Sequence, residues 1–195
     1  MNYLDNIALF DLDGTLADYD SAIQKDLALI ASPNDPTYIS WGDNPDYLEK
    51  RIKLIRQRPG WWRNLGKFQL GFDVLEIARE FGYEIEILTK GPRSATSSWT
   101  EKAEWAMDNV PDADVTITEK KGRHYGKVLV DDYPGYIEGW LQQRPRGLVI
   151  MPAHSYNEEF SHQRIVRYDG SNIDQVRRAM MIARDRKSGE PLRLA

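Results

Sequence analysis

The chain has 195 residues, a formal charge of −4 and no cysteine, so disulfides, thiol catalysis and cysteine metal sites are excluded. The small negative charge argues against a broad basic surface for long nucleic acids, and no apolar run approaches the roughly 20 residues of a membrane span. The first residues lack the basic and apolar regions of a signal peptide. We therefore expect a soluble, cytoplasmic protein of one α/β domain with an insertion.

A short apolar run near the start of the chain predicts a buried strand at residues 7–10. Asp11 and Asp13 follow it directly, before Gly14, which permits a sharp turn. Open α/β sheets bind ligands at this end of their strands. Two carboxylates this close repel each other unless a cation or a shared proton relieves them, and a divalent metal is the natural relief. A carboxylate beside such a metal can attack a phosphoryl group, whereas the plain alternative is a strand end followed by a solvated turn.

Residues 17–65 separate the first strand from the next by more than a usual connection. Two apolar stripes at helical spacing predict two helices, the first with Ile23, Leu27 and Ile30 and the second with Leu48, Ile52 and Ile55. We expect a helical cap at 17–65, inserted in a core of residues 1–16 and 66–195. Aromatic residues at its edges favour a lid over a substrate: Tyr19, Trp41, Trp61 and Trp62. The alternative is a structural insertion in which they pack the cap onto the core.

The rest of the chain alternates strand and helix patterns, which predicts a mainly parallel sheet flanked by helices. We expect strands at residues 83–88, 115–118, 128–130 and 148–151. We expect one helix that ends before Gly82 and three more at residues 97–109, 136–143 and 173–184.

Several later residues carry chemistry at predicted strand ends. Thr89, followed by Lys90, ends the second strand, where a hydroxyl can donate to a phosphate; Asp131 and Asp132 follow the strand at 128–130. Phosphoryl transfer also needs positive charge, for which the residues alone leave three candidates: Lys120, Lys121 and Lys127. The histidines do not show metal-ligand spacing, and we interpret all three as structural or exposed: His124, His154 and His162.

The sequence D-L-D-G-T at residues 11–15 resembles motif I of the haloacid dehalogenase (HAD) superfamily of phosphohydrolases. Thr89, a lysine after the third strand and the Asp131-Asp132 pair resemble motifs II, III and IV in the same order. The resemblance implies a Rossmann-like core with a cap, Mg²⁺ as cofactor, Asp11 as nucleophile, and Asp13 as general acid and base. It also implies metal ligation by Asp11, by the Asp13 backbone carbonyl and by Asp132, with Asp131 acting through a water or indirectly.

A closer resemblance is to the 5'(3')-deoxyribonucleotidase family. P-G-W-W-R-N-L at residues 59–65 resembles that family's P-G-F-F-x-x-L, and residues 11–19 and 99–105 are similar to two further segments. Thr118 lies three residues before Lys121 and Asp131 ten after it, the family's offsets, which favours Lys121 over Lys127. One departure is the motif II segment, where this chain has Thr-Lys-Gly-Pro instead of Thr-Ser-Pro.

The sequence therefore predicts a magnesium-dependent phosphatase that hydrolyses (deoxy)ribonucleoside monophosphates through an aspartyl-phosphate. Thr89 and Lys121 would clamp the phosphate, and the expected substrate contacts are Tyr19, Trp41, Trp61, Trp62 and Lys90. The alternatives are a HAD phosphatase of another small phosphate ester or of nucleic-acid 3'-phosphate ends, and a non-enzymatic HAD-fold binding protein. The expected partner is a small-molecule nucleotide, with no membrane and no long nucleic acid; a homodimer is left open.

Overall fold

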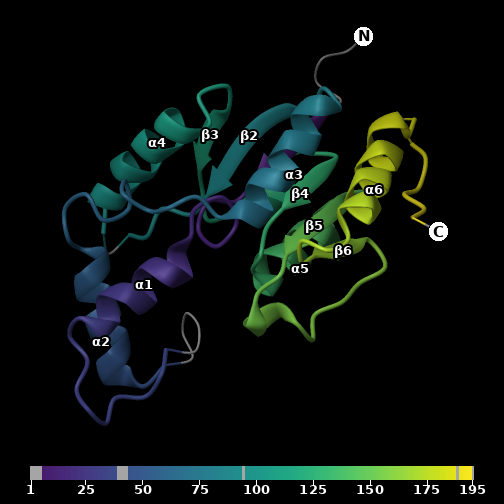
Figure 1. The fold of residues 1–195 in the computed structure, drawn as a ribbon. Helices are drawn as coiled ribbons and strands as arrows, with labels where there is room; N and C mark the ends of the chain where they lie inside the picture. Colours follow the sequence, from purple (N-terminus) through teal and green to yellow (C-terminus); the bar gives the residue numbers. More distant parts are fainter. Residues whose placement is uncertain (1–5, 39–43, 94, 188, 195) are drawn as a thin grey trace.

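The computed structural model describes residues 6–38, 44–93, 95–187 and 189–194. In these residues, six parallel strands form one sheet in the order β3-β2-β1-β4-β5-β6 (Figure 1). They are β1 (Ile7–Phe10), β2 (Glu84–Thr89), β3 (Asp114–Ile117), β4 (Val128–Val130), β5 (Leu148–Pro152) and β6 (Ile165–Tyr168). The chain moves outward from β1 to β2 and β3 and then returns to β4 on the other side of β1. This reversal opens a crevice beyond the carboxyl ends of β1 and β4.

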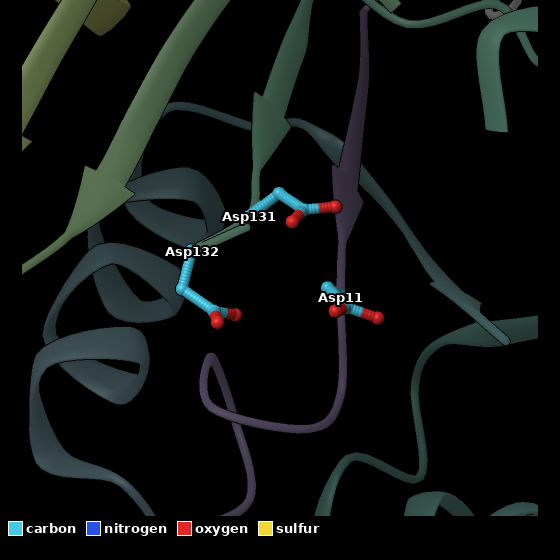
Figure 2. A group of neighbouring side chains, drawn as sticks. All are labelled: Asp11, Asp131 and Asp132. Carbon is cyan, nitrogen blue, oxygen red and sulfur yellow. The ribbon is translucent and has the colours of Figure 1, made fainter. Parts of the chain in front are cut away.

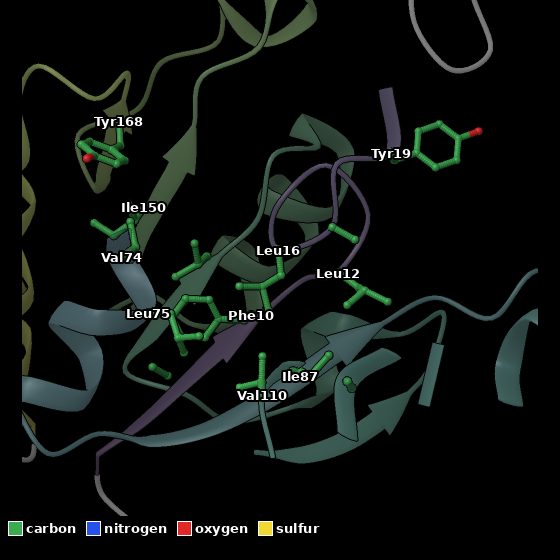
Figure 3. Packing of buried hydrophobic residues seen from close by; sticks show 14 of the residues in the cluster. Phe10, Leu12, Leu16, Tyr19, Val74, Leu75, Ile87, Val110, Ile150 and Tyr168 are labelled. Atoms are coloured by element: carbon green, nitrogen blue, oxygen red, sulfur yellow. The ribbon is translucent and has the colours of Figure 1, made fainter. Parts of the chain in front are cut away.

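Helices cover both faces of the sheet, which confirms the predicted α/β class. They are α3 (Gln69–Glu80), α4 (Ser97–Asn109), α5 (Pro134–Gln143) and α6 (Ile173–Asp185). Side chains alternate along each strand, so Ala8 and Phe10 of β1 pack with α3 and α6, whereas Leu9 packs with α5. Figure 3 shows Phe10 beside Leu75 of α3 in the larger of these two cores.

The segment between β1 and α3 contains helices α1 (Tyr19–Ala28) and α2 (Asp46–Arg56), which pack against each other. Figure 1 shows this pair away from the helices that cover the sheet. The backbone enters and leaves the insertion through one hydrogen-bonded neck. In this neck the Asp18 N–H donates to Gly66 O at 2.8 Å and the Phe68 N–H donates to Leu16 O at 2.8 Å.

Two details differ from the expected elements. α1 ends at Ala28, before the break at residues 32–36, so Ile30 lies outside the helix and is 50% exposed instead of buried. β6 was not expected, because its strand-forming residues Ile165, Val166 and Tyr168 make a run of only four residues at the sheet edge. Among the described residues, every helix is too short or too polar to cross a membrane.

Candidate active site

Three acidic residues meet in the crevice between β1 and β4. Asp11 directly follows β1, and Asp131 and Asp132 directly follow β4, so the parallel pairing of these strands brings the three together. One carboxylate oxygen from each lies within 4.8 Å of the others, and all three residues are buried. Figure 2 shows the carboxylates gathered beyond the strand ends. We refer to Asp11, Asp131 and Asp132 as the three-acid group.

Lys121 supplies positive charge to this group from the turn after β3. Its Nζ lies 2.7 Å from Asp11 Oδ1 and 2.7 Å from Asp131 Oδ2, and its side chain is 2% exposed. Burial alone would lower the pKa of Lys121, but the charges of Asp11 and Asp131 raise it above its ordinary value. The ammonium therefore stays charged. Lys127 lies elsewhere, with its Nζ donating to Arg184 O at the end of α6 at 2.8 Å.

Asp132 is held on several sides. The Thr15 hydroxyl donates to its Oδ1 at 2.7 Å, the Tyr156 hydroxyl donates to Oδ2 at 2.5 Å, and the Asn157 amide donates to its backbone carbonyl at 2.9 Å. Gly14 has φ of +78°, and a Cβ at this position would lie 2.7 Å from Asp132 Oδ2. Only glycine suits both the turn and the close approach of the acid.

The carboxylates of the three-acid group are too crowded for all to ionise easily. Burial, partly opposed by Lys121, raises the pKa of Asp131 to about 7, and burial, partly opposed by His154, raises that of Asp132 to about 6. The negative charge of Asp11 adds to both shifts. A hard divalent cation would relieve this repulsion.

Asp13 points away from the three-acid group and pairs with a second buried lysine. Lys102 Nζ on α4 lies 2.5 Å from Asp13 Oδ2 and donates to the Lys90 carbonyl at 2.7 Å. It also lies 3.4 Å from Thr89 Oγ1 and 4.4 Å from the centre of the Trp62 ring. Burial raises the pKa of Asp13 above its ordinary value, and the charge of Lys102 opposes this rise. A carboxyl group with a raised pKa suits proton transfer.

A cleft of about 910 Å³ opens over Asp11, Asp13 and Asp132. Its remaining walls come from the cap, from α4, and from the segments that follow β2, β3, β4 and β5. The lining residues include Tyr19, Asp20, Arg56, Trp62, Lys90, Pro92, Arg93, Lys102, Glu119, Tyr133, Pro134, Tyr136 and Tyr156. This volume suits a ligand of nucleotide size.

The expected substrate contacts divide into three groups. Tyr19, Trp62 and Lys90 line the cleft. Trp61 lies behind Tyr19, with ring centres 5.5 Å apart, and its indole N–H donates to Asp26 Oδ2 at 2.7 Å. This position fits the packing alternative that the sequence allowed. Trp41 lies outside the described residues.

Helix α4 also holds the end of the cap. The Glu101 carboxylate accepts the backbone N–H of Gly60 at 2.8 Å and that of Trp62 at 3.1 Å, and the Trp105 indole donates to Leu65 O at 2.8 Å. Glu101 and Lys102 are neighbours in sequence. Consecutive residues of one helix therefore contact the cap's exit turn and the proposed acid, Asp13.

Sequence reasoning did not assign Lys102, Arg56, Tyr156 or His154 to the site. His154 lies between the rings of Phe68 and Tyr156, both 4.9 Å away, and its Nε2 lies 2.7 Å from the Gly14 carbonyl. A histidine in a loop after a strand has no distinguishing pattern. Lys102 did lie in a segment that resembles the deoxyribonucleotidase family, and that was the one signal available for it.

The charges of the site fit a divalent cation. Four carboxylates, the three-acid group and Asp13, face two buried ammonium groups, Lys121 and Lys102, which leaves an excess of two negative charges when all are ionised. The donor atoms are carboxylate oxygens, which Mg²⁺ prefers. The Asp13 carboxylate is engaged by Lys102, so ligation by this residue would use its backbone carbonyl, and that role stays a prediction.

In the comparisons with known proteins, similar proteins were found among solved structures only. No protein-family model and no curated protein matches the chain. One similar solved structure is assigned as a β-phosphoglucomutase from Thermotoga maritima, with 13% identity, a TM-score of 0.45 and coverage of 88% of this chain and 91% of that chain. Another is a HAD hydrolase of family IA, variant 3, from Entamoeba histolytica, with 12% identity, a TM-score of 0.46 and coverage of 88% and 99%.

Proposed function

We propose that this protein is a HAD-type phosphatase that uses Mg²⁺ and hydrolyses small phosphate monoesters, with (deoxy)ribonucleoside monophosphates as the expected substrates. The observation that carries the proposal is the placement of Asp11. Its carboxylate lies 2.7 Å from the charged Lys121, within the three-acid group and at the base of a cleft of about 910 Å³. A nucleophile, a fixed positive charge and space for an ester thus coincide.

The residues suggest a two-step reaction. An oxygen of Asp11 attacks phosphorus, the bond from phosphorus to the ester oxygen breaks, and Asp13 gives its proton to that oxygen. Asp13 then takes a proton from water, and the water oxygen attacks the aspartyl-phosphate and releases phosphate. Lys121 holds Asp11 in place, and Thr89 and Lys102 border the position expected for the phosphoryl oxygens.

Mg²⁺, when held by Asp11, Asp132 and the Asp13 carbonyl, with Asp131 nearby, would neutralise charge on the phosphoryl oxygens. In its absence, both carboxylate oxygens of Asp132 still have donors, from Thr15 and Tyr156. These two hydroxyls keep the carboxylate in one orientation, which favours binding of a cation without rearrangement.

The test is phosphate release from a panel of common ribo- and deoxyribonucleoside monophosphates, other small phosphate esters and an oligonucleotide with a 3'-phosphate. We expect turnover of nucleotides in the presence of Mg²⁺, and loss of turnover with a chelator. Asp11→Asn should lower turnover by about 10⁴-fold or more without unfolding the protein, whereas Asp108→Asn on the surface of α4 should not. Absence of turnover of every ester would favour the non-enzymatic alternative, and activity confined to the oligonucleotide would favour end processing.

A further inference from the structure

Arg56 differs from the other arginines of the cap. Arg51 pairs with Asp35 and Arg58 pairs with Asp26. Arg56 ends α2 and lines the cleft, and no carboxylate in the described part of the chain lies within ion-pair distance of it. A cation at a helix C-terminus interacts favourably with the helix dipole, but this does not require it to face the cleft. The unpaired charge is thus available to a ligand.

The backbone at Arg56 is fixed by a cleft residue. The Trp62 indole N–H donates to the Arg56 carbonyl at 3.0 Å, and the Trp62 ring faces Lys102 on its other side. Arg56 is therefore anchored, through Trp62, to the wall that also carries the Asp13–Lys102 pair. This contact fixes the backbone from which the Arg56 side chain extends into the cleft.

A second donor lies beside it. Tyr19 is 7% exposed, and its hydroxyl is buried beside the Arg56 guanidinium. The ring is packed 5.5 Å from Trp61 and 5.7 Å from Trp62, so its position beside the cleft is fixed. Figure 3 shows this hydroxyl directed away from the sheet core. Burial raises the pKa of the Tyr19 phenol and the charge of Arg56 opposes the rise, so the phenol remains a donor at neutral pH.

The scissile phosphate does not need these groups, because Lys121 and Lys102 already lie beside Asp11 and Asp13. Among the described residues of the cap, the acid that lines the cleft is Asp20, and it has partners of its own. Its Oδ1 accepts from Tyr38 at 2.8 Å and its Oδ2 lies 3.5 Å from His154. A ligand at the cap end would thus meet two donors, the Arg56 guanidinium and the Tyr19 hydroxyl.

We propose that Arg56 and the Tyr19 hydroxyl form a subsite for a second anionic oxygen group on the substrate, at the end remote from the scissile phosphate. The inference rests on the proposed phosphatase activity and narrows its substrate class. Preferred substrates are phosphate esters that carry a second phosphate or a carboxylate, and among nucleotides these are bisphosphates. Arg56 is a specificity residue in this proposal and takes no part in bond breaking.

Two matched pairs of esters test the subsite. The first is 2'-deoxyadenosine 5'-monophosphate with its 3',5'-bisphosphate, and the second is glycerol 3-phosphate with 3-phosphoglycerate, which differs by a carboxylate. We expect a lower KM for the doubly anionic member of at least the first pair. Arg56→Gln should raise that KM about ten-fold or more and change the KM of the singly anionic member little. The control Arg51→Gln, at the arginine of α2 that pairs with Asp35, should change neither.

Tyr19→Phe removes the hydroxyl and keeps the packed ring. It should therefore raise the KM of the doubly anionic esters and leave the melting temperature nearly unchanged. Preference in the first pair alone assigns the subsite to phosphate, and preference in both assigns it to anionic oxygen groups in general. The proposal would be overturned if the wild-type protein had equal KM values for the two esters of each pair. It would also be overturned if Arg56→Gln raised the KM of the singly and the doubly anionic ester equally.

A binding measurement separates this proposal from the proposed function. Asp11→Asn protein is titrated calorimetrically with the bisphosphate, with and without the added Arg56→Gln change. Tighter binding that depends on Arg56, in a protein whose parent hydrolyses no ester, would support the subsite and refute the phosphatase. Hydrolysis by the parent protein, together with bisphosphate binding that is unchanged by Arg56→Gln, would support the phosphatase and refute the subsite.

Discussion

The Lys102 ammonium lies 2.5 Å from the Asp13 carboxylate, although 89 residues separate them in the chain. Both groups depend on this contact. Lys102 is 1% exposed, and without Asp13 its charge would be buried with neutral donors and acceptors only. Asp13 in turn needs a nearby cation if it is to ionise again after giving up its proton.

The first prediction concerns this pair. Lys102→Met should lower turnover by about 10²-fold or more, since Asp13 without its cation stays protonated and cannot take a proton from water. The pH optimum should move upward, because the loss of Lys102 raises the pKa of Asp13 further. The double variant with Asp13→Asn should recover thermal stability without recovering activity, and Lys53→Met on the surface of α2 serves as the control. An unchanged pH profile in Lys102→Met would argue against the assignment.

Lys121 and Lys127 give a second prediction, measured by steady-state phosphate release. Lys121→Met should cost about 10²-fold or more in turnover, because Lys121 contacts the proposed nucleophile directly. Lys127→Met removes a donor to the end of α6, so its expected effect is a lower melting temperature with turnover nearly intact. The opposite pattern would mean that motif III has been assigned to the wrong lysine.

A third prediction follows from the hydroxyl of Tyr156, which donates to Asp132 Oδ2 at 2.5 Å. Tyr156→Phe should weaken Mg²⁺ binding about ten-fold, because the carboxylate loses a group that orients it. Calorimetric titration with Mg²⁺ alone measures this without turnover. Tyr125→Phe, at an exposed tyrosine, is the matched control. Equal Mg²⁺ affinity in wild type and Tyr156→Phe would show that Asp132 does not need this hydroxyl.

The raised pKa values of Asp131 and Asp132 predict how the stability of the folded protein depends on pH. Asp131 and Asp132 have pKa values of about 7 and 6 in the folded protein, above the ordinary 3.8. Their contribution to stability is thus full below about pH 4 and is lost as the pH rises through about 6 to 7. The melting temperature of metal-free protein should fall over this range, and Asp131→Asn with Asp132→Asn should flatten the fall. Excess Mg²⁺ should raise the melting temperature more at pH 8 than at pH 5, where protons compete for the oxygens.

The secondary structure was largely predictable because local patterns determine it. α4 begins and ends at the expected residues 97 and 109, and β4 covers the expected residues 128–130. The strand ends then indicated which acids would meet. Lys102 was not predictable from its helix, because a lysine between Glu101 and Ala103 has the pattern of a solvent-exposed position. Only the tertiary fold reveals that it is buried against Asp13.

Arg56 illustrates a different limit of prediction from the sequence. Its place in the last turn of α2 is typical of basic residues that stabilise a helix end, so the sequence offers a sufficient reason for it. That no carboxylate of the described residues pairs with Arg56 depends on how the cap lies over the cleft. That relationship between distant segments has no trace in the spacing of residues.

The hydrogen-bonded neck of the insertion suggests that the cap is removable. Leu16 and Asp18 are bonded to Phe68 and Gly66, so the two cut ends already lie side by side and a short linker could join them at little entropic cost. The six-stranded sheet, Lys102 and Lys121 lie outside the excised segment. Under the proposed function, the shortened protein would have an open phosphate site without Tyr19 and Arg56, so we expect it to lose substrate selectivity but to keep hydrolysis.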